Sequence, residues 1–173
     1  LLLEPHFLQV YSTPGRRADA INFFHRRPIP EFGAALYRLF AGADRIYAPV
    51  LVGGSHWIFL VVWLRFGYCE VYDSMGGLHR RTAHRLVTML EDMCSTHCLV
   101  QLRALLDIKE WGFIHHRKGG PQQHDGAACG VFVCLTALCL FLRRPVTFSH
   151  REVMYWRLRI AYLIATHPTR GEE

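Results

Sequence analysis

The apolar run from Val131 to Leu142 is the longest in the chain, and it limits the possible folds more than any other segment. It is well short of the roughly 20 residues that a helix needs to cross a bilayer, so we interpret it as a core helix over 129–142. The chain has 173 residues, of which 51% are hydrophobic. A chain of this length buries about two thirds of its unfolded surface, and we expect one domain over 1–173.

Cys129 lies at the start of this predicted helix, behind a turn-rich loop that runs from Pro121 to Ala128. The amide dipoles at a helix N-terminus stabilise a thiolate relative to a thiol, which favours a nucleophile. An isolated helix cysteine is more often buried and inert. Gln123 in the same loop carries an amide that is placed to donate to an oxyanion, and this pairing favours a reactive role for Cys129.

Two apolar segments upstream predict an antiparallel hairpin. They run from Ile58 to Leu64 and from Tyr68 to Tyr72, and a tight turn around Arg65-Phe66-Gly67 joins them. Such a hairpin brings His56, before the first strand, close to Asp73, after the second. A histidine oriented by a carboxylate is the general base that a thiol nucleophile needs. Asp73 is also a common turn residue, and that structural role is the alternative for it.

The pattern along the chain predicts an α+β domain in which helices flank a group of strands. We expect helices at 17–26, 31–41, 79–95 and 129–142, and a last helix that begins at Ser149. We expect strands at 46–52, 57–65, 68–73, 98–105 and 111–116.

The ordered set of His56-Trp57, Asp73 within Tyr72-Asp73-Ser74, and Gln123 six positions before Cys129-Gly130 resembles the ubiquitin-like-protein-specific cysteine proteases, the SUMO protease family. The resemblance extends from about residue 17 to 165. It implies the fold of these enzymes, in which helices flank a central mixed β-sheet and the nucleophile starts a buried central helix. One departure is Ala128, because SUMO proteases usually have Asp there. The quartet Ala127-Ala128-Cys129-Gly130 looks more like the adenovirus maturation protease.

The resemblance implies a thiol protease that cleaves a peptide or isopeptide bond after the C-terminal glycine of a ubiquitin-like modifier, SUMO or ubiquitin. Cys129 would be the nucleophile, His56 the general base, Asp73 its orienting acid and Gln123 the oxyanion donor. Trp57 would form one wall of the tunnel for the glycine tail, and His124 and Gly126 would also contact substrate.

Other functions fit parts of the same pattern. A viral-type protease would mature a polyprotein, and an effector-type acetyltransferase with the same His-Asp-Cys order would use acetyl-CoA. An inactive homologue would bind a modifier without turnover, and a structural domain would leave Cys129 unreactive.

The composition of the chain limits the kinds of partner, compartment and cofactor that we expect. The net charge is +6, but the arginines are dispersed as short pairs, and we expect no nucleic-acid partner and no membrane association. Six scattered cysteines indicate a reducing compartment, either nucleus or cytoplasm, or a host cell if the protein is a secreted effector. Cys94 and Cys98 lie one helical turn apart without a second ligand pair, so we expect no metal and no cofactor. We also expect a monomer.

Overall fold

The computed structural model describes residues 13–15, 42–96, 111–116 and 120–166. Its strands are β1 (Arg45–Val52), β2 (His56–Trp63), β3 (Tyr68–Tyr72) and β4 (Gly112–His115). Its helices are α4 (Arg80–Thr96), α6 (Cys129–Phe141), the short 3-10 helix η2 (His150–Glu152) and α7 (Val153–Thr166). Each agrees with a predicted element within a few residues. The predicted helices at 17–26 and 31–41 and the strand at 98–105 lie outside the described residues.

The strands form one mixed sheet in the order β1-β2-β3-β4. β1 pairs antiparallel with β2, and β2 antiparallel with β3, whereas β4 runs parallel to β3. Gly53 and Gly54 form the turn between β1 and β2 and have φ angles of 60° and 76°, which non-glycine residues rarely adopt. This tight turn places His56 opposite Val52 at the end of the sheet.

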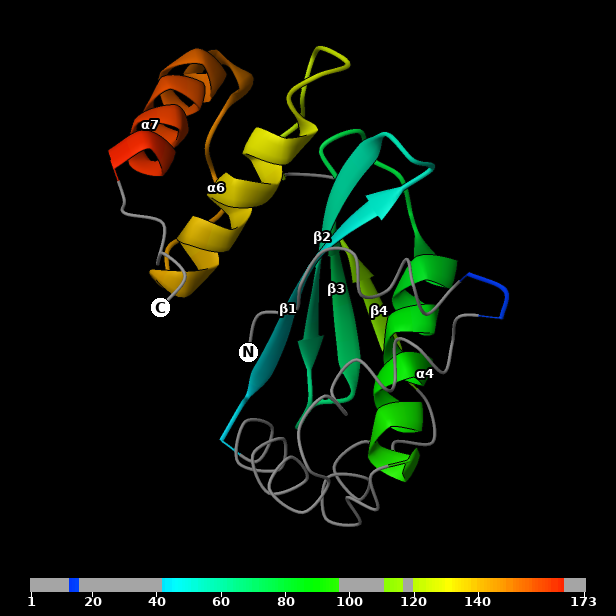
Figure 1. Ribbon diagram of the computed structural model, residues 1–173. Helices are drawn as coiled ribbons and strands as arrows, with labels where there is room; N and C mark the ends of the chain where they lie inside the picture. The colour runs from blue at the N-terminus through cyan, green and yellow to red at the C-terminus, as the bar shows by residue number, and fades with distance from the viewer. Residues whose placement is uncertain (1–12, 16–41, 97–110, 117–119, 167–173) are drawn as a thin grey trace, which may run out of the picture.

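The central strand β2 is buried on both faces because helices cover both sides of the sheet there (Figure 1). Alternate residues of β2, such as Leu60, belong to a core cluster that includes Leu86 and Leu90 of α4. The intervening residues, such as Phe59, pack with α6 residues in a second cluster. A strand that is buried on both faces consists of a continuous run of apolar residues. This explains why every residue from Ile58 to Leu64 is apolar.

Helix α6 begins at Cys129, as predicted, and is buried along one side. Phe132, Leu135 and Thr136 are buried, while Leu138 and Phe141 on the other side are exposed. Among the described residues, no helix is both long enough and apolar enough to span a membrane.

Candidate active site

His56 and Asp73 meet at one end of the sheet. His56 is the first residue of β2 and Asp73 directly follows β3, so the pairing of these strands brings them together. The Nε2 atom of His56 lies 2.6 Å from Oδ1 of Asp73, whose side chain is only 2% exposed. The contact predicted from the hairpin is therefore present.

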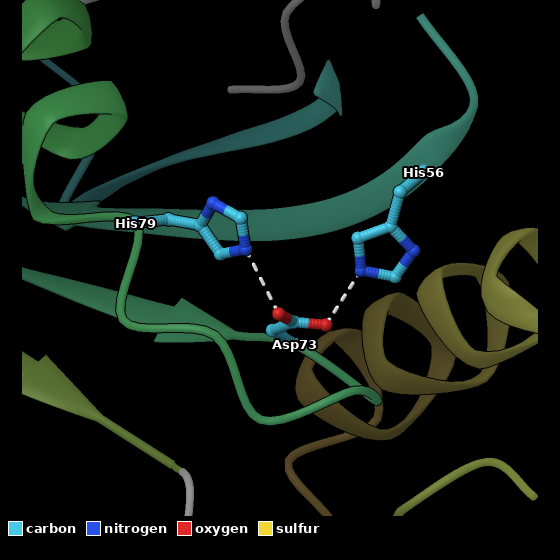
Figure 2. A group of neighbouring side chains, drawn as sticks. All are labelled: His56, Asp73 and His79. Carbon is cyan, nitrogen blue, oxygen red and sulfur yellow. Dashed lines mark hydrogen bonds and ion pairs between the residues drawn. The ribbon is translucent and has the colours of Figure 1, made fainter. Parts of the chain in front are cut away.

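Asp73 accepts hydrogen bonds from four N–H donors. Oδ1 takes the Met75 amide at 2.8 Å in addition to His56, and Oδ2 takes the Gly77 amide at 2.7 Å and Nε2 of His79 at 2.8 Å. Figure 2 shows the two imidazole rings on either side of the carboxylate. Burial alone would raise the pKa of Asp73, but these hydrogen bonds outweigh it and the pKa is lowered. Asp73 is therefore held as a carboxylate.

The ionised state of this carboxylate fixes one proton on each ring, because a carboxylate can only accept hydrogen bonds. An ionised carboxylate offers about four lone-pair sites, and four N–H groups occupy them here. Each histidine must then carry its hydrogen on Nε2. The Nδ1 atom of His56 is left as an acceptor and is directed away from Asp73 (Figure 2). A base for a thiol proton is therefore available at Nδ1.

By residue type, the group of His56, Asp73 and His79 could also ligate a metal ion, because its ligand atoms lie within 4.8 Å of one another. A metal would have to displace the protons that both rings donate to Asp73. The geometry is that of a hydrogen-bonded proton network, and we assign no metal to it.

Gln123 is tied to Ser74, the residue that follows Asp73. The Gln123 amide N–H donates to the Ser74 carbonyl at 2.9 Å, and the Ser74 hydroxyl donates to Oε1 of Gln123. The Nε2 atom of Gln123 donates one hydrogen to the Asp125 carbonyl. These contacts hold the side-chain amide in place. They use only one of the two hydrogens on Nε2, so the second can donate to an oxyanion.

Cys129 is 6% exposed and opens α6. The first four amides of a helix have no partner within the helix, so the Cys129 N–H is a potential oxyanion donor. Oδ1 of Asp125 accepts the amides of Ala127 and Ala128 at 2.9 and 2.8 Å, which fixes the turn before the helix. Ala128 itself makes no side-chain cap, so Asp125 is the side chain that orders the end of this loop.

Trp57 connects the two halves of the site. A Cβ added to Gly130 would lie 3.9 Å from Cδ1 of Trp57, so the indole lies beside the first turn of α6. The residues that follow His56 and Cys129 are therefore neighbours. Trp57 also lines a pocket with Tyr72, Pro121 and Phe132.

The other two residues predicted to contact substrate lie on the loop before α6, and both are exposed. The ring of His124 stacks on that of His150, with centroids 5.0 Å apart. Gly126 has nothing within 4 Å of its Cβ position, which leaves room for another chain. Their contact with substrate stays a prediction.

Three residues of the site were not predicted from the sequence: His79, Ser74 and the loop-ordering Asp125. Ser74 follows the predicted acid Asp73, and Asp125 lies between Gln123 and Cys129. These positions in the sequence were the signals from which a role in the site could have been predicted. His79 had no such signal, because its contact with Asp73 depends on the backbone between β3 and α4.

Comparison with known proteins identifies the family of this chain. Residues 30–171 match the model of the Ulp1 protease family, C-terminal catalytic domain. The chain is 30% identical over 112 residues to human Sentrin-specific protease 2, a match that covers 63% of this chain and 18% of that protein. It is 25% identical over 126 residues to Ubiquitin-like-specific protease 1 of Saccharomyces cerevisiae, covering 71% of this chain and 19% of the relative. The chain thus spans about a fifth of the length of these relatives.

Solved structures give the same fold. The C-terminal Ulp1 protease domain in complex with Smt3, the yeast orthologue of SUMO, aligns with a TM-score of 0.64 at 21% identity, over 96% of this chain and 67% of that one. The catalytic domain of the Chaetomium thermophilum Ulp1-like SUMO protease aligns with a TM-score of 0.56 at 21% identity, over 86% and 60%. The predicted fold and family resemblance are confirmed, and the chain belongs to the Ulp1 protease family.

Proposed function

We propose that the chain is a cysteine peptidase that hydrolyses the peptide or isopeptide bond after the C-terminal glycine of a ubiquitin-like modifier. The observation that carries this proposal is the 2.6 Å contact between His56 and Asp73, which leaves Nδ1 of His56 as a base. Membership of a protease family supports the same chemistry.

In the proposed reaction, Nδ1 of His56 takes the thiol proton of Cys129, and the thiolate sulfur bonds to the carbonyl carbon. The carbonyl oxygen becomes an oxyanion, which the Gln123 side-chain N–H and the Cys129 backbone N–H stabilise. The C–N bond then breaks, and the leaving amine takes the proton from His56. Water next attacks the thioester and gives a proton to His56, and cleavage of the C–S bond releases a carboxylate and restores the thiol.

Asp73 acts in this scheme by holding His56. It accepts the Nε2 hydrogen, so it fixes the ring and stabilises the imidazolium that forms when Nδ1 is protonated. The lowered pKa of Asp73 keeps its negative charge in place throughout. On this proposal Trp57, which lies beside Gly130 at the start of α6, would confine the tail that enters the site, and a passage narrowed in this way would admit glycine.

SUMO is the modifier that the relatives favour. The yeast Ulp1 domain was solved in complex with Smt3, and the Chaetomium enzyme is described as a SUMO protease. We extend this preference to the present chain, with ubiquitin as the second candidate. We further propose that residues 1–173 act as one catalytic domain and as a monomer, in a reducing compartment that keeps Cys129 as a free thiol.

Covalent trapping tests this proposal. The chain is incubated with SUMO and with ubiquitin that carry a C-terminal electrophile, and adducts are followed by gel shift. Wild type should form an adduct with SUMO, and Cys129→Ala should form none. Cys134→Ala is the matched control, because Cys134 is a free cysteine on the same helix and should leave the adduct intact.

The outcomes separate the alternatives. An adduct with ubiquitin alone would show that ubiquitin rather than SUMO is the substrate, and the proposed chemistry would stand. If neither modifier reacts although a small alkylating reagent labels Cys129, the proposed substrate class is wrong. Cleavage of a polyprotein then becomes the best-supported function. If Cys129 resists alkylation in the folded protein, the proposed nucleophile is wrong.

A further inference from the structure

We propose that His79 is a positioning residue of this active site, which holds the Asp73 carboxylate in the orientation that serves His56. This role rests on the proposed function of His56, Asp73 and Cys129.

The backbone at His79 is held in an uncommon conformation. Its φ angle is 43°, in the left-handed region that few non-glycine residues occupy. The first turn of α4 begins here, because the Ala83 amide donates to the His79 carbonyl at 3.0 Å. Such conformations cost free energy and cluster at functional sites. At this position the conformation directs the imidazole onto Asp73 (Figure 2).

Gly77 provides the space for this contact. A Cβ at position 77 would overlap both Nε2 of His79 and Oδ2 of Asp73. The amide of Gly77 meanwhile donates to the same Oδ2 atom. Only glycine at this position therefore lets the backbone amide and the imidazole approach the same oxygen together. The segment after β3 thus has the conformation that a second histidine needs in order to contact Asp73.

His79 completes the set of donors that fixes the carboxylate. With it, each oxygen of Asp73 has one imidazole and one amide donor, and the rotamer is determined from both sides. Without it, Oδ2 keeps only the Gly77 amide. The carboxylate then gains freedom to turn away from His56, and the orientation of the base is lost with it.

Two other basic groups lie near His79. Arg80 follows it in the chain, and His115 of β4 is close enough that the charges of Arg80 and His79 contribute, after burial, to lowering the pKa of His115. Neither group has a hydrogen bond to Asp73 among those that join the described residues. Both remain unchanged in the variants below, so the effect of His79 can be measured on its own.

The test compares His79→Gln and His79→Ala with wild type. The glutamine amide retains an N–H donor at a similar reach but does not titrate, whereas alanine removes the donor. His84→Gln is the matched control, because His84 is exposed on α4 and its ring faces Thr88. Two profiles are measured against pH: kcat/KM on a modifier substrate, and the rate at which iodoacetamide alkylates Cys129, followed by mass spectrometry.

His79→Gln should keep the plateau of both profiles within about twofold, because an N–H donor to Oδ2 of Asp73 remains. His79→Ala should lower the plateau of kcat/KM about tenfold, as expected for the loss of a hydrogen bond to a charged group. Gly77→Ala should reproduce this loss by displacing the imidazole. His84→Gln should leave both profiles in place.

A wild-type plateau in His79→Ala, or a loss in His79→Gln as large as that in His79→Ala, would overturn the positioning role. Inactivation of wild type by EDTA would show instead that the three side chains hold a cation. Alkylation needs no modifier, so it tests His79 even if no substrate is cleaved. A lowered alkylation plateau in His79→Ala without hydrolysis in wild type would support His79 and refute the proposed function.

Discussion

Replacing Ser74 by alanine should slow the proposed reaction by misorienting Gln123. Ser74 is 6% exposed and its hydroxyl donates to Oε1 of Gln123, which leaves the amide nitrogen facing the Asp125 carbonyl. The backbone bond from the Gln123 amide to the Ser74 carbonyl survives the substitution, so the loop should stay in place. The change therefore removes one orienting contact from an otherwise intact site.

The size of the effect follows from that one hydrogen bond. A neutral hydrogen bond contributes about 0.5–1.5 kcal/mol net, so kcat should fall between about twofold and tenfold, with about fivefold as the central value. Gln123→Ala removes the oxyanion donor itself and should cost about 10²–10³ in kcat.

The assay is a double-mutant cycle on a fluorogenic SUMO or ubiquitin substrate, with kcat measured for each single variant and for the pair. If Ser74 acts only through Gln123, Ser74→Ala should have almost no effect once Gln123 is alanine. Ser55→Ala, at an exposed position of the β1–β2 turn, is the control and should match wild type. Equal losses from Ser74→Ala in both backgrounds would refute the reasoning.

Three further predictions concern acid stability, thiol reactivity and the loop before α6. The folded pKa of Asp73 lies below its unfolded value, so its stabilising effect is complete above about pH 4 and is lost as pH falls through the folded pKa. Urea unfolding should accordingly show a stability difference between wild type and Asp73→Asn that shrinks from pH 7 to about pH 3. Burial, and secondarily a neighbouring carboxylate, raises the pKa of the Cys69 thiol to about 12, so at about pH 8 almost none of it is thiolate, and iodoacetamide should modify Cys69 far more slowly than the proposed nucleophile Cys129. Mass spectrometry of the two peptides, with and without urea, checks this, and equal labelling in the folded state would contradict the burial argument. Asp125→Ala should lower kcat because the loop amides lose their acceptor, whereas Asp125→Asn keeps an acceptor oxygen and should retain most of the rate; a similar loss in both would show that charge matters more than the hydrogen bonds.

The acid–base half of the site was predictable because it depends on local pairing. Two strand segments and the turn between them determine a hairpin, and the hairpin determines which residues lie at its open end. The observed register pairs Phe59 with Tyr72, and the contact between His56 and Asp73 follows from it. The mixed sheet and the helix that starts at Cys129 came from the family resemblance and the apolar pattern together.

The remaining contacts of the site could not be predicted from the sequence, for physical reasons. The bonds between Ser74 and Gln123 join residues 49 positions apart, and no local pattern specifies which of the loop's polar groups meet. His79 reaches Asp73 through a left-handed backbone conformation and the absence of a side chain at Gly77. Such arrangements depend on tertiary structure, and a histidine before a helix carries no mark of them in the sequence.

The placement of the nucleophile on a helix that follows the whole hairpin has a consequence for biosynthesis. Chains fold from the N-terminus as they are made, and local hairpins form before distant contacts. A nascent chain would therefore assemble His56 with Asp73 while α6 is still unmade. On the proposed mechanism, the nascent chain has no peptidase activity until α6 has been made and has packed against Phe59 and Val61, so the order of synthesis sets when activity begins.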